Sequence, residues 1–216
     1  MRINKYLALH LNTSRRKADE LILKNKIKVN NKLAVLGQEI ITSDIISYDG
    51  KILPSDVMYK YYKFYKPIGY VCSTKTQGQS KTIYEILKDY SLKYSGRLDK
   101  DSEGLMLLSN DGDWLNSLNH PSNEVMKEYV VTLFESIEVN SFKKKVVDNG
   151  ETLKIDSIVK KNQLEYRVAL TTGKNREIRR IFSKNKLEIK NLKRISIGSY
   201  KLGKLKIGEL SEIKSI

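Results

Sequence analysis

A carboxylate flanked by cations lies near the middle of the chain, in the sequence GRLDKDSEGLMLLSNDG at residues 96–112. Asp99 stands between Arg97 and Lys100, with glycines on both sides that permit a loop. The apolar residues 105–108 predict a buried strand after this loop. A carboxylate held by rigid neighbours at the mouth of a sheet is well placed to act as a nucleophile or a general base. By composition alone, a structural salt bridge is the competing interpretation.

Further motifs follow this sequence in a fixed order. They are KEY at residues 127–129, TGKNREIRR at 172–180 and LKRISIG at 192–198, followed by Leu202-Gly203 and Gly208-Glu209. Together the motifs resemble those of the ribosomal RNA pseudouridine synthases of the RsuA and RluB group. In that family GRLD is followed by Thr-x-Gly, and Ser102 replaces the threonine here while keeping the hydroxyl group. Because the likeness spans nearly the whole chain, it is far more specific than any single motif.

The resemblance implies a role for each residue at a matching position. Asp99 would attack the sugar of a uridine or abstract a proton from it, and Tyr129 would stack on the flipped uracil and assist proton removal. Arg179 would pair with Asp99 and hold it ionised. Arg97 would hold the extruded nucleotide or its phosphate, and Ile178 would pack beside the base. The other substrate-binding residues implied by the same motifs are Lys127, Lys174, Arg176 and Arg180.

A target base must leave its stack to reach Asp99, and this costs roughly a few kcal/mol that cationic contacts to the RNA backbone can offset. Each candidate cation, taken singly, could equally belong to an exposed basic face. The candidates for this task are Lys174, Arg176, Arg180, Lys193 and Arg194.

The implied reaction moves a bond from a base nitrogen to a base carbon without a redox change, so we expect no cofactor. We also expect no metal site, because one cysteine and two histidines at these spacings cannot supply a ligand set. Cys72 is the single cysteine, so no internal disulfide can form, which fits a reducing compartment. It follows Val71 in an apolar, strand-like run, which favours a packing role over a nucleophilic one.

Composition points to a polyanionic partner. The chain has 216 residues, a formal net charge of +15 and a sequence pI of about 9.6. So strong a basic excess is typical of proteins that bind nucleic acid. The alternative is a lysine-rich surface without a partner, which the clustering of cations at candidate sites disfavours.

The N-terminal segment predicts a small domain of two helices and a strand pair. Ile3, Tyr6, Leu7 and Leu11 have helical spacing, and a second helix over residues 15–24 follows a cap at Thr13 or Ser14. Apolar residues from 27 to 35, interrupted at Asn30-Asn31, predict a strand, a tight turn and another strand.

The sequence SRRKADELILKNKIKVNNKLA at residues 14–34 resembles the S4 RNA-binding domain, with Asn25 and Asn31 where that family usually has glycine. Cations clustered at a helix start oppose the positive helix terminus, which favours a bound polyanion over a merely solvated face. The phosphate-facing residues implied by the resemblance are Arg15, Arg16, Lys17, Lys24, Lys26 and Lys28.

The expected domain boundaries follow from these segments. We expect an S4-like domain at residues 1–48, a linker at 49–58 that contains Asp49-Gly50 and Pro54, and a catalytic domain at 59–216. Tyrosines, a phenylalanine and lysines alternate over residues 59–66. This pattern suits either a strand that stacks on RNA bases or a half-buried strand of a sheet.

The rest of the chain predicts an α+β fold. Residues 127–134, 164–170 and 187–197 read as strands, and residues 139–147 and 176–184 read as helices, the former with Phe142 and Val146 inward. Few helices separate the strands, so the fold is not doubly wound. The resemblance implies a mixed, mainly antiparallel sheet of the pseudouridine synthase fold beside a small S4-like α/β domain.

The leading hypothesis is therefore the isomerisation of a uridine in ribosomal RNA or in a ribosome assembly particle. Weak likenesses at residues 120–129 and 173–180 favour the large-subunit rRNA over the small-subunit rRNA. A catalytically silent RNA-binding assembly factor is the alternative, but such a relative should have lost Asp99, Tyr129 or Arg179. A DNA-binding regulator would leave GRLD unexplained. We expect a monomer, because the RNA supplies the interaction surface. We expect it in the cytoplasm, since no apolar run is long enough to span a membrane.

Overall fold

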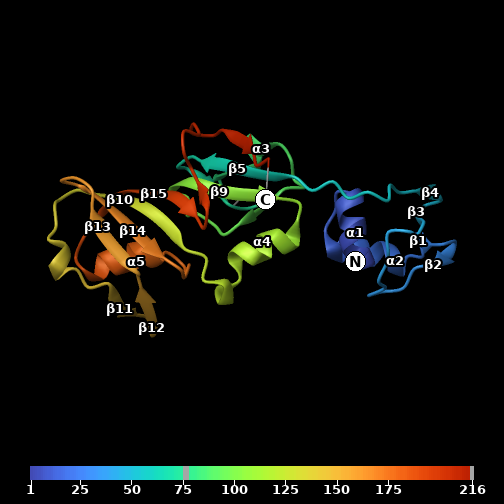
Figure 1. Ribbon diagram of the computed structural model, residues 1–216, viewed down its shortest axis with the longest axis horizontal. Helices are drawn as coiled ribbons and strands as arrows, with labels where there is room; N and C mark the ends of the chain where they lie inside the picture. Colours follow the sequence, from blue (N-terminus) through green and yellow to red (C-terminus); the bar gives the residue numbers. More distant parts are fainter. Residues whose placement is uncertain (75–77, 215–216) are drawn as a thin grey trace. The chain divides into compact units, whose positions relative to one another are not determined.

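The computed structural model describes residues 1–74 and 78–214 and divides the chain into two compact units, Met1–Lys60 and Tyr61–Ile216 (Figure 1). The expected catalytic domain, residues 59–216, includes residues 75–77 and 215–216, which lie outside the described residues. Among the described residues, no helix is both long and apolar enough to cross a membrane.

The first unit contains two helices and a four-stranded antiparallel sheet. Its elements are α1 (Ile3–His10), α2 (Arg15–Leu23), β1 (Ile27–Val29), β2 (Lys32–Leu33), β3 (Ile46–Tyr48) and β4 (Lys51–Ile52), and the strand order is β2-β1-β3-β4. Ser14 caps α2 by accepting a hydrogen bond from the backbone N–H of Lys17. The predicted turn between β1 and β2 is confirmed, because Asn30 and Asn31 have φ values of 49° and 65°.

The core of this unit contains apolar residues of α1, α2 and β1 whose spacing in the sequence predicted these elements. They include Ile3, Leu7, Ile22 and Ile27. Residues 49–52 of the expected linker instead turn the chain at Asp49-Gly50 and form β4, which pairs with β3. This part of the chain therefore belongs to the sheet of the first unit.

The second unit is built around a nine-stranded, mainly antiparallel sheet. Its main path runs through β13 (Ser157–Lys160), β14 (Glu165–Leu170), β10 (Lys127–Leu133), β15 (Ile189–Ile197), β9 (Glu103–Ser109), β5 (Tyr61–Lys66) and β17 (Leu210–Glu212). β8 (Lys93–Ser95) also pairs with β9, and β16 (Tyr200–Lys201) pairs with β15. The predicted α+β class with mainly antiparallel sheets is confirmed.

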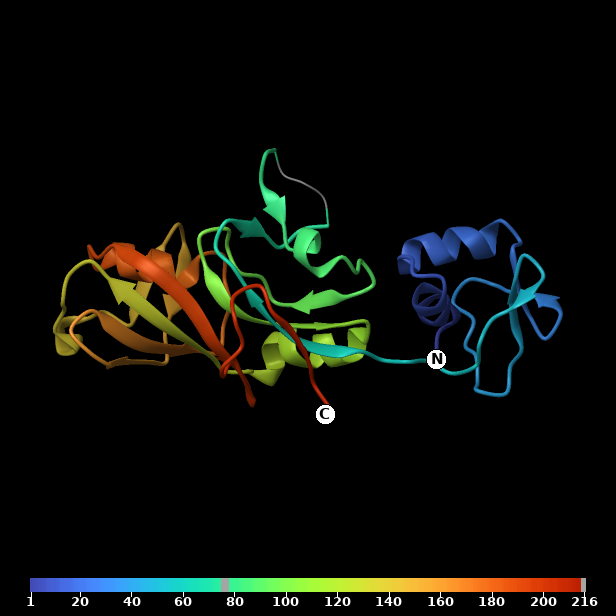
Figure 2. The same cartoon turned by 90° about the horizontal axis from the view of Figure 1, so that it is seen from above.

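Shorter elements cover and flank this sheet. They are β6 (Tyr70–Val71), β7 (Lys81–Thr82), β11 (Lys145–Asp148), β12 (Glu151–Lys154), α3 (Tyr84–Leu87), α4 (Gly112–Asn119), α5 (Glu177–Lys184) and the 3-10 turns η1 (Pro121–Asn123) and η2 (Val139–Ser141). α4 packs against β8 and β9 (Figure 2), and α5 packs against the β11–β12 hairpin (Figure 1).

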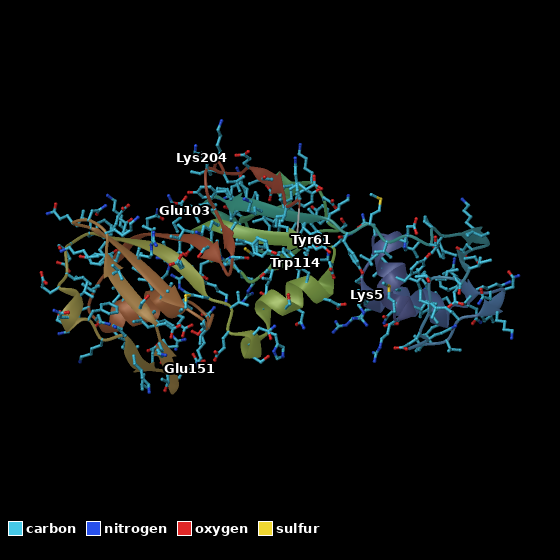
Figure 3. All side chains as sticks on the ribbon, in the orientation of Figure 1. Lys5, Tyr61, Glu103, Trp114, Glu151 and Lys204 are labelled. Atoms are coloured by element: carbon cyan, nitrogen blue, oxygen red, sulfur yellow. The ribbon has the colours of Figure 1, made fainter. Side chains whose placement is uncertain are left out.

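Strand β9 is buried on both faces, as its apolar sequence predicts. Met106 and Leu108 join one cluster with Phe64 of β5, whereas Leu105 and Leu107 join a second cluster on the opposite face. Tyr61 and Trp114, both labelled in Figure 3, meet edge to face at 5.1 Å and tie α4 to the start of β5. The strand that follows the Asp99 loop is thus a rigid support.

The sheet opens where β9 changes partners. One edge of β9 pairs with β5, while the other pairs with β15 at Glu103 and Gly104 and with β8 from Leu107 to Ser109. The loop from β8 to β9, which carries Asp99, emerges between these two partners. The split between β8 and β15 therefore creates room beside Asp99.

The predicted helix at residues 139–147 is wrong. η2 is a single 3-10 turn, and residues 145–148 form β11, which pairs with β12. Asn149 and Gly150, with φ values of 48° and 77°, form the turn of this hairpin, and Asn-Gly is a strong hairpin signal. Phe142 is nevertheless buried, against Phe182 of α5.

Candidate functional site

A cleft of about 710 Å³ lies at the split of the sheet in the second unit. Its walls come from residues 96–102, residues 119–125, the edges of β10 and β15, and the segment that leads into α5. The predicted site residues that line it are Asp99, Tyr129, Arg179, Arg97, Ile178, Lys127, Lys174 and Arg176. Segments far apart in the chain, such as those of Asp99 and Arg179, which are 80 positions apart, thus meet in one cavity.

A buried lysine side chain holds the loop that carries Asp99 in place. Lys66, at the end of β5, is fully buried, and its Nζ donates hydrogen bonds to the backbone oxygens of Pro67 at 2.9 Å, Asp99 at 3.0 Å and Ser102 at 2.7 Å. Burial lowers the pKa of Lys66 to about 8. The backbone N–H of Ser102 also donates to the Asp99 oxygen at 3.1 Å. These bonds hold the loop in one conformation.

Two arginines and a second carboxylate surround Asp99. Arg176 Nη1 lies 3.4 Å from Asp99 Oδ2, and its guanidinium donates two hydrogen bonds to Asp101, at 3.2 and 3.0 Å. Arg179 Nε lies 3.3 Å from Asp101 Oδ2, and its Nη2 donates to the backbone oxygen of Asp101 and to Ser102 Oγ.

The predicted ion pair of Arg179 with Asp99 is therefore corrected. Within the described residues Asp99 pairs with Arg176, and Arg179 pairs with Asp101. The guanidinium of Arg179 is taken up by Asp101, through the carboxylate at 3.3 Å and the backbone oxygen at 2.8 Å. Burial raises the pKa of Asp101, but the hydrogen bond from Arg176 and the charges of both arginines outweigh it, so the pKa lies below its usual value.

An apolar wall faces this charged cluster. Tyr129, from β10, is only 8 % exposed, and Ile178, from α5, is 5 % exposed, so both present little more than an edge to the cleft. Across the sheet Tyr129 is paired with Val168 of β14 and with Arg194 of β15. A flat base could enter between the charged and the apolar walls.

The cleft also contains a buried guanidinium. Arg194 is 2 % exposed, its Nε donates to the Leu105 oxygen at 2.7 Å, and its Nη1 lies 3.5 Å from the Arg97 oxygen. It thus bridges the gap between β9 and the Asp99 loop. Lys193, its neighbour, points to the opposite face, where it lies 3.8 Å from Glu103 (Figure 3) and over the Tyr65 ring.

Of the remaining predicted cations, Lys127, Lys174 and Arg97 line the cleft, whereas Arg180 does not. Lys127 Nζ donates to the backbone oxygens of Val125, Thr171 and Thr172, so its charge joins two walls of the cleft. Lys174 Nζ donates to the Thr152 oxygen. Arg97 and Lys174 line the cleft with Lys127.

Arg180 is not among the residues that line the cleft. Its guanidinium donates to Asp148 at 2.6 Å and to Glu151 at 2.7 Å, on the β11–β12 hairpin (Figure 3 labels Glu151). This arginine holds α5 to the hairpin, and its predicted role in substrate binding is not supported.

The predicted phosphate-facing residues of the first unit are all exposed. Three of the six have partners: Arg15 donates to Asn4, Lys17 pairs with Glu20 at 2.8 Å and Lys26 pairs with Asp49 at 3.0 Å. Lys24 is exposed beside Glu20. The side chains of Arg16 and Lys28 make no hydrogen bond or ion pair within the described residues, so their charges are available to a ligand.

Several residues of the site were missed by the sequence analysis. Lys66 lies in the aromatic and basic run at residues 59–66, and the structure favours the half-buried strand over the RNA-stacking strand for this run, because β5 lies between β9 and β17. Asp101 lies in the motif at residues 96–112, two positions beyond Asp99. Asn119 and Thr171 lie outside the motifs and carried no signal, although they line the cleft.

Cys72 has the expected packing environment. Its sulfur lies 3.3 Å from the Leu98 oxygen and 3.6 Å from the sulfur of Met106, and burial raises the pKa of the thiol. It supports the Asp99 loop from the side of β6.

Comparisons with known proteins agree with this geometry. Residues 60–184 match the family described as RNA pseudouridylate synthase, and residues 1–52 match the S4 domain. An uncharacterized RNA pseudouridine synthase of Borreliella burgdorferi is 34% identical over 233 residues, covering 100% of this chain and 92% of that protein. The dual-specificity RNA pseudouridine synthase RluF of Escherichia coli K12 is 30% identical over 221 residues, covering 99% and 75%.

One solved structure is similar to this chain over nearly its whole length. The crystal structure of a pseudouridylate synthase has a TM-score of 0.68 and 25% sequence identity, and the match covers 99% of this chain and 96% of that one. The similarity therefore extends over nearly the full length of both chains.

Proposed function

The chain belongs to the RNA pseudouridylate synthase family, and on that premise we propose that it converts a specific uridine of ribosomal RNA to pseudouridine with Asp99 as its catalytic residue. The observation that carries this proposal is the meeting of Asp99, Tyr129 and Arg179 in one cleft, although they come from three segments of the chain. The volume of about 710 Å³ suits one extruded nucleotide with room for its phosphates.

The reaction balances without an external reactant. The bond between ribose carbon 1′ and base nitrogen 1 breaks, the base turns, and carbon 5 bonds to the same ribose carbon. Carbon 5 loses its proton to solvent, and nitrogen 1 gains one. The chain must therefore provide a group that acts at the sugar, a surface on which the base can turn and a route for one proton.

The cleft residues can divide this work. Asp99, which is partly exposed and held on a rigid loop, would act at the sugar as a nucleophile or as a base. Tyr129 and Ile178 would hold the two faces or edges of the base while it turns. The Tyr129 hydroxyl would assist removal of the proton from carbon 5.

Cations in the cleft would keep the nucleotide extruded. Arg97 and Lys174 are directed to the cleft and are candidates for contacts with the flanking phosphates. The exposed cations of the first unit would add contacts to a neighbouring part of the RNA. One chain supplies all these groups, so we propose that it acts as a monomer on cytoplasmic rRNA or on an assembly particle.

Large-subunit rRNA is the first candidate substrate, and small-subunit rRNA is the second. The likeness of residues 120–129 and 173–180 to the large-subunit branch supports this order. The relative in Escherichia coli is named a dual-specificity enzyme, so more than one class of RNA should be offered.

The test is a release assay. Large-subunit rRNA, small-subunit rRNA and transfer RNA transcripts, each labelled with tritium at uracil carbon 5, are incubated with the full chain and no cofactor. Release from large-subunit rRNA at one nucleotide, located by mapping the pseudouridine, is the expected result. Binding without release from any transcript or from partly assembled particles would instead support the silent assembly factor.

A further inference from the structure

Arg176 is shared unequally between two carboxylates. Its guanidinium donates two hydrogen bonds to Asp101, at 3.2 and 3.0 Å, which is the paired geometry that binds a carboxylate most firmly. Its approach to Asp99, at 3.4 Å, is an ion pair without a hydrogen bond. Asp101 thus has the strong contact, and the contact with Asp99 is the one that can be exchanged.

The surroundings of Arg176 agree with an exchangeable contact. Its side chain is 45% exposed, as is that of Asp101 at 48%, so water and ligands reach the guanidinium. Exposed ion pairs contribute only about 0–1 kcal/mol to stability. The pair therefore adds little to the stability of the fold, and rearranging it costs little.

The backbone of Arg176 is held in an unfavourable conformation. Its φ is 47° and its ψ is 32°, at the N-cap of α5, where it has no side-chain capping hydrogen bond. A non-glycine residue in this region costs roughly 1–2 kcal/mol. This conformation directs the side chain away from α5 and toward the Asp99 loop, where Asp101 receives it.

On the basis of the function proposed above, we propose that Asp101 is a positioning residue that keeps the Arg176 guanidinium at the cleft while an RNA phosphate displaces that guanidinium from Asp99. The target nucleotide carries its phosphates on the same ribose that Asp99 must reach. A phosphate therefore arrives beside Arg176 when the sugar arrives at Asp99. Transfer of the cation from Asp99 to the phosphate binds the RNA and frees the Asp99 carboxylate in the same step.

Asp101 has a second task in this arrangement. Its carboxylate also pairs with Arg179 at 3.3 Å, and its backbone oxygen accepts from the same guanidinium at 2.8 Å. Lys66 fixes the loop on the opposite side through the oxygens of Asp99 and Ser102. Asp101 is thus fixed in place and can hold Arg176 while the partner of that arginine changes.

The phosphate contact is tested by the salt dependence of binding. The dissociation constant for a transcript of large-subunit rRNA is measured for the full chain at several salt concentrations. Arg176→Gln should lower the slope of log affinity against log salt by about one, because one phosphate contact is lost. Lys184→Gln is the matched control, because Lys184 lies on α5, pairs with Asp148 and is not among the residues that line the cleft. An equal decrease of this slope in Arg176→Gln and Lys184→Gln would overturn the proposed transfer of Arg176 from Asp99 to a phosphate.

The positioning role is tested by single-turnover kinetics on the transcript that the wild-type protein modifies. Asp101→Asn should reduce the rate constant at saturating RNA about tenfold, since displaced catalytic groups lose rate, and should leave the dissociation constant within about twofold. Asp101→Glu should recover part of the rate. Asp148→Asn, which removes a carboxylate partner of Arg180 on the far side of α5, should leave the rate unchanged.

The results separate this proposal from the function on which it rests. A wild-type rate constant unchanged in Asp101→Asn would overturn the positioning role while leaving the synthase intact. A melting temperature lowered in step with the rate, without recovery by Asp101→Glu, would mean a structural role and would also overturn it. Absence of turnover in the wild-type protein would overturn the proposed function. The salt dependence of RNA binding by Arg176→Gln and Lys184→Gln would still show whether Arg176 contacts an RNA phosphate.

Discussion

The ammonium group of Lys66 lies 3.0 Å from the backbone oxygen of Asp99 and is buried beneath the loop that carries this aspartate. It uses its other two donors on Pro67 and Ser102. A lysine can donate three hydrogen bonds, so every donor is satisfied. The carboxylate that we propose to act in the cleft is thus supported by Lys66, which is not among the residues that line the cleft.

Replacing Lys66 should destabilise the protein. Lys66→Met leaves three buried or half-buried oxygens without this donor, and we expect a loss of about 2–4 kcal/mol in the free energy of unfolding. Lys63→Met on the same strand is the control, because Lys63 is half-buried and its side chain makes no hydrogen bond within the described residues. Urea unfolding of both variants measures the difference, and equal losses would refute the role of Lys66.

The same lysine predicts a dependence of stability on pH. Burial lowers the pKa of Lys66 from 10.5 to about 8 in the folded protein. Between pH 8 and pH 10.5 the unfolded chain binds more protons than the folded protein does. The free energy of unfolding therefore rises with pH over this range. The free energy of unfolding of the wild-type protein, minus that of Lys66→Met, should therefore increase from pH 8 to pH 10.5. A decrease across that range would contradict the lowered pKa.

Gly104 should tolerate no side chain. A methyl group there would overlap the backbone oxygen of Arg194 and lie 2.6 Å from its nitrogen, and the φ of Gly104 is 113°. Because this clash involves backbone atoms where β9 meets β15, Gly104→Ala should cost more than about 3 kcal/mol. Gly112→Ala, where a methyl group meets no atom within 4 Å, is the control for thermal melting. Similar melting temperatures for the two variants would be inconsistent with close packing at this junction.

The first unit should contribute to affinity and not to chemistry. Arg16 and Lys28 have no protein partner within the described residues, whereas Lys17 and Lys26 are paired with carboxylates. Combined Arg16→Gln and Lys28→Gln substitutions should lower the salt slope of RNA binding by about two and leave the saturated rate unchanged. Lys17→Gln with Lys26→Gln removes the same charge and should lower the slope less. If both pairs behave alike, net charge and not specific contact explains binding by this unit.

The sequence predicted those parts of the site that lie inside ordered motifs. Asp99, Tyr129 and Arg179 were expected together because the motifs resemble one family, and the cleft gathers them. The partner of Asp99 was not predictable, because Arg176 and Arg179 follow one another on one segment and only their direction in space decides which reaches which carboxylate. In the structure Arg176, at the N-cap of α5, reaches both Asp99 and Asp101, whereas Arg179 pairs with Asp101.

The fold was predictable where apolar periodicity is strong and local. β9, β10, β14 and α5 follow from their patterns, whereas residues 139–147 have helical spacing of apolar residues and still form a 3-10 turn and a strand. The Asn149-Gly150 turn and pairing with β12 outweigh that spacing. Lys66 could not be assigned to the interior, since its burial depends on backbone oxygens from residues 33 and 36 positions away.

The central claim is that Asp99 performs the chemistry, and single-turnover release of tritium from labelled rRNA tests it most directly. Asp99→Asn keeps the size of the side chain, so the RNA dissociation constant should change by less than about threefold. If Asp99 is catalytic, this variant should bind the transcript and release no tritium above background. Release by Asp99→Asn at a rate near that of the wild-type protein would contradict the catalytic assignment, whatever its effect on binding.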